Sequence, residues 1–107
     1  MINQELIEAI KNCQIVAYQF NGELCFAEPC SVGFGHDGIA AMMVFQTQGP
    51  TPLPGFRWVY RRIHAFENLQ LTNSLFIPRC DHCIRDMRFK EIVAIIKMKP
   101  NQTYKHN

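Results

Sequence analysis

The sequence predicts a mainly β fold with flanking helices (α+β), built as a small, strongly bent barrel of five strands. Short runs of strand-like composition follow one another with little more than turns between them, and an amphipathic segment stands at each end of the series. So few short strands cannot form two packed sheets, which favours one bent sheet. At 107 residues the chain is about one domain; we expect residues 1–100 to form it and residues 101–107 to be a flexible tail.

An apolar stripe predicts an amino-terminal helix. Apolar side chains recur at helical spacing at Ile2, Leu6, Ala9, Ile10 and Cys13. Asn3 is a suitable cap, because its side chain can accept a hydrogen bond from a backbone N–H of the first turn. We expect this helix to end near Asn12.

Turn residues divide the middle of the chain into five predicted strands, which are Gln14–Phe20, Glu23–Val32, Ile39–Thr47, Arg57–His64 and Glu67–Thr72. Asn21-Gly22 is a strong signal for a two-residue hairpin turn between the first two strands. Pro29 indicates an edge strand or a bulge in the second, because proline has no backbone N–H to donate. A glycine-containing loop at 33–38 and a proline-rich connector at 49–55 separate the following strands.

Beyond Pro78 the period of the apolar residues changes, and the sequence predicts a carboxy-terminal helix from about Asp86 to Met98. One side of such a helix would carry Phe89, Ile92, Val93 and Ile96. Pro100 would end it, because proline lacks the N–H of the helical hydrogen bond and its ring clashes with the preceding turn.

The composition is that of an ordinary globular protein, with 48% hydrophobic and 19% charged residues. The longest apolar runs, Ile39–Phe45 and Ile92–Ile96, are far shorter than the roughly 20 residues of a membrane span, so we expect no membrane partner. The first residues lack the features of a secretory signal, which predicts a cytoplasmic location and reduced cysteines. Residues 1–56 carry a net charge of −4 and residues 57–107 one of +6, a basic half that can attract anions.

Segment 56–64, Phe-Arg-Trp-Val-Tyr-Arg-Arg-Ile-His, is the clearest indication of a binding partner. In a strand, one face would carry Phe56, Trp58, Tyr60 and Arg62, and the other Arg57, Val59, Arg61 and Ile63. Tyr and Trp with Arg between them suit base stacking, cation–π contacts or phosphate pairing. The same rings also fill small β cores, and arginines also solvate a surface, so both interpretations stay open. The candidate ligand-binding residues are Arg57, Trp58, Tyr60, Arg61 and Arg62.

Two other motifs bear on cofactors and metals. Gly33-Phe34-Gly35-His36-Asp37-Gly38 fits the glycine pattern of dinucleotide-binding loops, but that motif requires a helix directly after it, and here a strand-like run follows. We therefore expect no cofactor. Cys80 and Cys83 have the spacing of half a zinc site and are weak candidate metal ligands. A complete site would also need Cys25 and Cys30, or His36 and His64.

The order of several short motifs resembles that of WYL-like domains, in particular the short stand-alone members. The first matching group is Ile7, Ala9 and Ile10, then Ile15-Val16-Ala17-Tyr18 with Gly22, Glu28-Pro29 and Val32-Gly33. The second is Val44-Phe45-Gln46, Gly49, Pro54-Gly55-Phe56-Arg57, Arg62-Ile63 and Phe76. Together they cover about residues 5–96. Where the family has its Trp-Tyr-Leu tripeptide, this chain has Ala41-Met42-Met43 or Met42-Met43-Val44.

The resemblance implies an Sm-like or SH3-like barrel. It also implies a role in binding ligands, often nucleic acids or nucleotides, within bacterial or phage-defence regulators. Arg62 is similar in position to the ligand-facing arginine of the family. The tripeptide's aromatic stacking is missing from this chain.

We therefore expect a non-enzymatic regulatory module that binds an anionic ligand, such as single-stranded nucleic acid or a nucleotide. The arginines would meet phosphates, and Trp58 or Tyr60 would stack. The alternative is a protein–protein or homo-oligomer module that uses the apolar run Met42–Phe45. Catalysis is not expected, because no histidine shows paired spacing with Asp, Ser or Cys.

Overall fold

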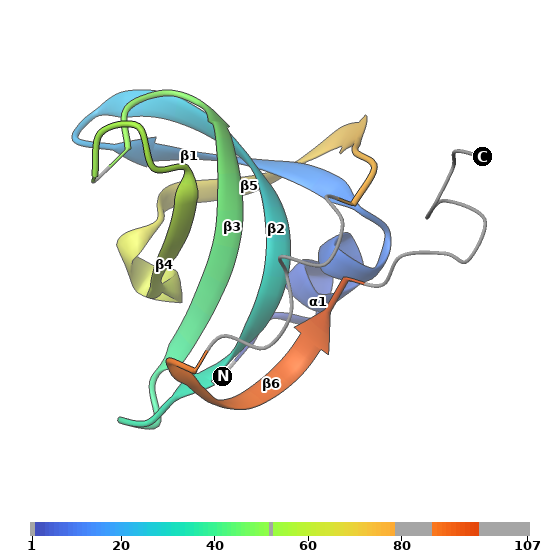
Figure 1. Cartoon of the computed structure of the whole chain (residues 1–107). Helices are drawn as coiled ribbons and strands as arrows, with labels where there is room; N and C mark the ends of the chain where they lie inside the picture. Colours follow the sequence, from blue (N-terminus) through green and yellow to red (C-terminus); the bar gives the residue numbers. More distant parts are fainter. Residues whose placement is uncertain (1, 52, 79–86, 97–107) are drawn as a thin grey trace, which may run out of the picture.

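The structure is a computed structural model that describes residues 2–51, 53–78 and 87–96 (Figure 1). Its elements are the helix α1 (Gln4–Lys11), the short 3-10 helix η1 (Ile63–Ala65) and the strands β1 (Gln14–Phe20), β2 (Glu23–Gly35), β3 (Ala40–Gln48), β4 (Trp58–Arg62), β5 (Glu67–Leu75) and β6 (Phe89–Ile95). The mainly β class and the amino-terminal helix are confirmed. Asn3 caps α1 as predicted, because its side-chain oxygen accepts a hydrogen bond from the N–H of Glu5 at 2.6 Å.

The first hairpin follows directly from its turn residues. β1 ends at Phe20 and β2 begins at Glu23, and between them Asn21 and Gly22 have φ angles of +53° and +80°. Positive φ at both central residues gives the turn whose twist matches two antiparallel strands, and Asn and Gly adopt that conformation most readily. The predicted two-residue hairpin is confirmed.

One antiparallel sheet contains all six strands, in the order β4-β3-β2-β1-β5 with β6 paired to β2. β2 is the centre of this arrangement: β3 pairs along one edge, while the other edge pairs with β1 as far as Ala27 and with β6 from Ser31 onward. The register with β3 shifts between Pro29 and Ser31, so the bulge predicted at Pro29 is confirmed. Figure 1 shows the resulting strong curvature of the sheet.

The sheet is open, and the closed barrel predicted from the sequence is wrong for the described residues. There, β4 pairs only with β3, and β5 only with β1, so these two strands are the ends of the sheet. β4 has 5 residues before the chain turns into η1, and β5 has two register irregularities against β1. Such irregularities twist an edge strand and oppose further pairing.

The predicted carboxy-terminal helix is also wrong where the structure describes it, because Phe89–Ile95 form β6. β6 approaches β2 so closely that a Cβ on Gly33 would lie 2.0 Å from the backbone oxygen of Glu91. Because Gly33 has no side chain, the remaining edge of β2 can pair with a sixth strand. β-branched residues such as Val93 favour the strand conformation in that segment. The ends of the predicted helix and the predicted tail 101–107 lie outside the described residues.

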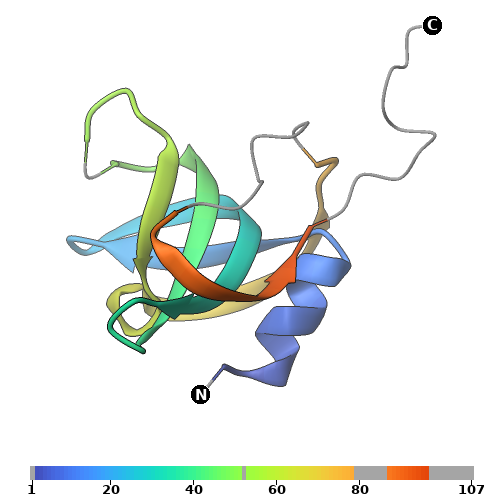
Figure 2. The ribbon, with the colours of Figure 1, turned by 60° about the horizontal axis from the view of Figure 1, so that its bottom comes forward.

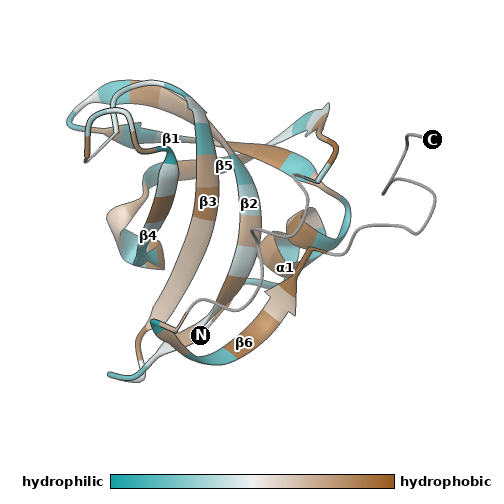
Figure 3. Ribbon diagram, in the orientation of Figure 1, coloured by the Kyte–Doolittle hydropathy of each residue, from teal (hydrophilic) through white to brown (hydrophobic). Residues whose placement is uncertain are grey.

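The core draws side chains from α1, from all the strands except β5, and from the residue after η1; they include Leu6, Ile10, Val16, Tyr18, Val32, Met42, Val44, Val59, Phe66 and Phe89. Helix α1 contacts β1, β2 and β6, the three strands that meet where β2 changes partner (Figure 2). Figure 3 shows that β3 is hydrophobic along most of its length and hydrophilic toward its end. Met42, Met43 and Val44 are at most 7% exposed, so the run Met42–Phe45 is mainly core and not the interaction surface that the alternative function assumed.

A buried polar pair fixes the connection between β3 and β4. The hydroxyl of Tyr18, whose side chain is in the core, donates to Oε1 of Gln46 at 2.5 Å. Nε2 of Gln46 in turn donates to the backbone oxygens of Gly49 at 3.0 Å and Pro50 at 2.6 Å. Burial raises the pKa of Tyr18 well above its ordinary value, so the hydroxyl remains a donor.

The backbone of Gln46 holds the far end of the same connection. Its N–H donates to the backbone oxygen of Arg57 at 2.8 Å, and its carbonyl oxygen accepts a hydrogen bond from Nη1 of Arg57 at 3.2 Å. One residue therefore binds both ends of the segment that joins β3 to β4.

Tyr18→Phe should destabilise the protein more than Tyr60→Phe, although each change removes one hydroxyl. At position 18 the change leaves Oε1 of Gln46 buried without its donor, which costs about 1–3 kcal/mol. The hydroxyl of Tyr60 donates to the backbone oxygen of Arg88 at an exposed position, where water replaces it at a cost below about 0.5 kcal/mol. Urea unfolding measures both free energies. Equal losses in the two variants would contradict the role given to Tyr18.

Candidate functional site

β4, at one end of the sheet, carries the predicted ligand-binding residues except Arg57, which directly precedes it. Val59 faces the core and is 5% exposed, whereas Trp58 and Tyr60 on the opposite face are half-buried. The alternation predicted for these positions is confirmed. The strand is shorter than predicted, because it begins at Trp58 and the chain enters η1 at Ile63.

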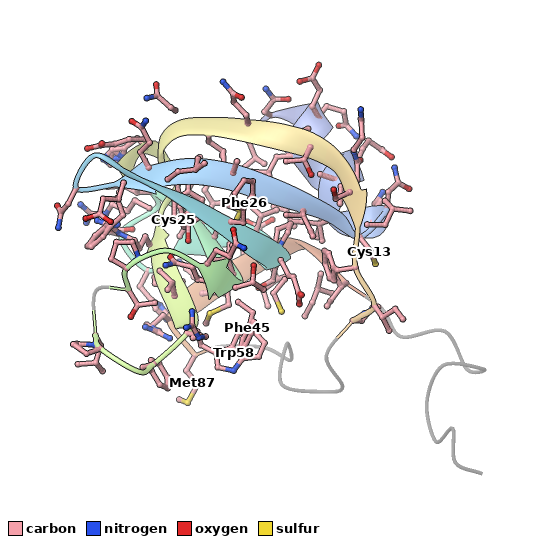
Figure 4. All side chains as sticks on the ribbon, turned by 90° about the horizontal axis from the view of Figure 1, so that it is seen from above. Cys13, Cys25, Phe26, Phe45, Trp58 and Met87 are labelled. Atoms are coloured by element: carbon pink, nitrogen blue, oxygen red, sulfur yellow. The ribbon has the colours of Figure 1, made fainter. Side chains whose placement is uncertain are left out.

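Trp58 and Tyr60 pack edge to face against other rings. The ring centroids of Trp58 and Phe45 are 4.9 Å apart with an interplanar angle of 69°, and Figure 4 shows these two side chains beside each other. The rings of Tyr60 and Phe89 are 5.0 Å apart at 76°. These geometries stabilise aromatic pairs. Because both residues are only half-buried, each ring belongs partly to the packing and partly to the surface.

The three predicted arginines have three different environments. Arg57 donates to the backbone oxygen of Gln46, and the guanidinium carbon of Arg61 lies 4.8 Å from the centroid of the Phe20 ring. Nη2 of Arg62 lies 2.6 Å from Oδ2 of Asp37, an ion pair. Within residues 2–51, 53–78 and 87–96, Arg62 alone among these three has an acidic partner. The positive charges of Arg57 and Arg61 are therefore not neutralised by a carboxylate there.

An open pocket beside β4 gathers part of the predicted set. Its lining residues are Phe20, Leu53, Phe56, Trp58, Val59, Tyr60, Arg61 and Arg88. The structure therefore brings Trp58, Tyr60 and Arg61 together and leaves Arg57 and Arg62 outside the lining. The described lining holds two guanidinium groups and no acidic, histidine or cysteine side chain. Such a surface suits a ligand that combines negative charge with planar or apolar groups.

Several residues of this pocket were not among the residues predicted from the sequence. Arg88 immediately precedes β6, and its guanidinium carbon lies 4.6 Å from the centroid of the Tyr60 ring. The sequence predicted a helix for that segment, and so did not place Arg88 beside β4. Phe20 comes from the end of β1, and Leu53 and Phe56 come from the connection that Gln46 anchors. Of these four residues, only Phe56 lies in segment 56–64, which the sequence indicated as a binding segment.

The glycine motif at 33–38 forms the end of β2 and its turn into β3. The strand predicted after it is confirmed, and a dinucleotide loop would need a helix there. In the turn, Oδ1 of Asp37 accepts a hydrogen bond from the N–H of Ile39 at 3.0 Å, while Oδ2 accepts one from Arg62. These donors, the N–H of Ile39 first, lower the pKa of the Asp37 carboxyl below its ordinary value.

The metal candidates Cys80 and Cys83 lie outside the described residues. Among the cysteines that the structure describes, Cys25 is a free thiol, whereas Cys30 is disulfide-bonded, so the predicted reduced state is wrong for Cys30. Burial raises the pKa of the Cys25 thiol and so disfavours the nucleophilic thiolate. In the part of the chain that is described, no three His, Cys, Asp or Glu side chains gather closely enough to hold a metal ion.

Comparisons with known proteins found no match to this chain. No model of a protein family matches the chain, and no curated protein or solved structure does either. The described residues contain no helix with both the length and the apolar character that crossing a bilayer requires. Function must therefore be inferred from the chemistry of the site itself.

The carboxyl of Asp37 should titrate below its ordinary value of 3.8 and should still do so in Arg62→Gln. Removing Arg62 takes away one donor and raises the pKa, but the N–H of Ile39, the larger cause, remains. Because the pKa is lowered by folding, the interaction stabilises the protein above about pH 4 and is lost as the pH falls through the folded-state pKa. NMR titration of the carboxyl carbon measures these values. An ordinary pKa in the unmodified protein would refute the turn geometry, and Arg57→Gln is the control that should change nothing.

Proposed function

We propose that this chain is a non-enzymatic regulatory module that binds an anionic ligand, such as single-stranded nucleic acid or a nucleotide, in the pocket beside β4. The observation that supports this function is the lining, which combines two guanidinium groups with aromatic rings and lacks acidic side chains among the described residues. Cationic groups attract phosphates, and aromatic rings stack on bases of any sequence. Among the described lining residues there is no acid, histidine or cysteine, which leaves little for general acid–base or nucleophilic chemistry.

Arg61 is the residue that we expect to contact a phosphate. Its side chain is half-buried and its guanidinium stacks on Phe20, which restrains the side chain without neutralising its charge. A restrained guanidinium loses less conformational freedom when it binds, and its planar fork matches two phosphate oxygens.

Phe56 and Trp58 are the rings best suited to stack on a base. Phe56 is 50% exposed and Leu53, also in the lining, is 62% exposed, so both offer apolar surface at the pocket. Trp58 is half-buried at the beginning of β4. Tyr60 is less suitable, because Arg88 lies over one face of its ring. Base stacking on aromatic side chains contributes about 1–3 kcal/mol per base.

We further propose that the fold is an open variant of an Sm-like or SH3-like barrel and that the chain is related to WYL-like domains. One helix followed by five successive antiparallel strands supports this relationship, and so does the position of β4 and β5 as the two ends that closure would join. The sixth strand, β6, is the feature that the resemblance did not imply.

A protein–protein or homo-oligomer module is the second candidate function. The buried run Met42–Phe45 does not support it, but Leu75 and Ile77, at 67% and 72% exposure, do. Exposed apolar side chains that lie close together are typical of contact surfaces. Salt distinguishes the two functions, because phosphate contacts weaken steeply as salt is added whereas an apolar interface does not.

Arg61→Gln should weaken the binding of a short fluorescein-labelled oligothymidine about tenfold at low salt, because it removes a charged partner of a phosphate. Lys11→Gln removes the same charge from α1, away from the pocket, and should change the affinity by less than about twofold. Fluorescence anisotropy gives the dissociation constants, and competition with unlabelled ATP tests for a nucleotide ligand.

Two results would count against this function. If the unmodified protein binds neither the oligonucleotide nor ATP at low salt, the pocket is not a site for such anions. If Lys11→Gln weakens binding as much as Arg61→Gln, the interaction is a diffuse charge effect and does not involve the pocket.

A further inference from the structure

The ion pair between Asp37 and Arg62 stands at the border of the pocket. Its two side chains remain 43% and 52% exposed, respectively, so the pair is open to solvent and to solutes. Arg62 follows Tyr60 by two residues on the same face of β4, a separation of roughly 7 Å along a strand. Tyr60 lines the pocket. A ligand held there therefore lies within reach of Arg62 if its guanidinium is released from Asp37.

The surroundings of Gly35 place the carboxylate of Asp37 near the pocket. A Cβ at this position would lie 3.1 Å from Oδ1 of Asp37 and also 3.1 Å from the hydroxyl oxygen of Tyr60. The two polar atoms thus border one small space, which is open because residue 35 has no side chain. The backbone oxygen of Arg88 is 3.6 Å from the same point.

The carboxylate of Asp37 does not depend on Arg62 for its position. Its Oδ1 is held by the N–H of Ile39 within the turn, which leaves Oδ2 for the arginine. A carboxylate and a phosphate offer a guanidinium the same kind of oxygen pair. Exposed ion pairs contribute little to stability, so a phosphate of a ligand can compete for Arg62 without unfolding the turn.

We propose that Asp37 is an internal competitor of the anionic ligand, because its carboxylate holds Arg62 away from the pocket. This inference rests on the proposed function. The contact lowers affinity for anions in general, and it lowers affinity least for ligands of high charge density, since these displace the carboxylate most readily. Asp37 is thus a positioning residue that sets affinity and charge selectivity without touching the ligand.

Asp37→Asn tests this role while preserving the turn, because the amide oxygen of asparagine can still accept the hydrogen bond from Ile39. Binding of labelled oligothymidine should become about fivefold tighter at low salt. The logarithm of the binding constant should also fall more steeply with the logarithm of the salt concentration, by about 0.7 for one additional phosphate contact. Glu8→Gln removes the same charge from α1 and should give neither change.

The double variant Asp37→Asn/Arg62→Gln and the single variant Arg62→Gln complete a double-mutant cycle, which tests whether the effect of Asp37 acts through Arg62. If Arg62 carries the effect, Asp37→Asn should not tighten binding once Arg62 is replaced. Tightening that persists without Arg62, or that Glu8→Gln reproduces, would overturn the inference while leaving the proposed function intact. Failure of both the unmodified protein and Asp37→Asn to bind the oligonucleotide would reject the proposed function and this inference with it.

Discussion

The buried hydrogen bond between Tyr18 and Gln46 is the constraint on which the pocket depends. Tyr18 belongs to β1 and Gln46 to β3, and the amide group that accepts from the tyrosine also donates to Gly49 and Pro50 at the start of the β3–β4 connection. That connection supplies Leu53 and Phe56 to the pocket. A buried amide without partners is costly, so packing of the core and shape of the site are linked through one side chain.

The fold could be predicted where the signal is local. Asn3 caps a helix and Asn21-Gly22 makes a turn through groups only a few residues away, and both outcomes follow from backbone geometry. The sequence did not predict the correct element where the structure depends on pairing between segments that are distant in the chain. The apolar spacing in residues 89–96 suits a helix, but the deciding factors were an unpaired edge of β2 and the missing Cβ of Gly33. Neither can be seen without the topology.

The same distinction applies to the site. Trp58, Tyr60 and Arg61 were predicted together because they share one strand, and the structure brings all three to one pocket. Arg88 could not be predicted, since its contact with Tyr60 exists only because β6 pairs with β2. The ion pair of Arg62 could not be predicted either, because its partner Asp37 lies in a turn whose conformation the glycine motif does not indicate.

Hydrogen exchange in the double variant Tyr18→Phe/Gln46→Met tests most directly whether this buried pair holds the pocket in shape. Replacing both polar partners leaves neither side chain of the pair without its partner, and the oxygens of Gly49 and Pro50, which lose the amide of Gln46, are only partly buried, so the fold should be retained. The amide of Phe56, which donates to the backbone oxygen of Leu53 at 3.0 Å, should exchange about tenfold faster, while the amides of Val44 and Val59 in the β3–β4 pairing keep their rates. Unchanged exchange at Phe56 would contradict the account.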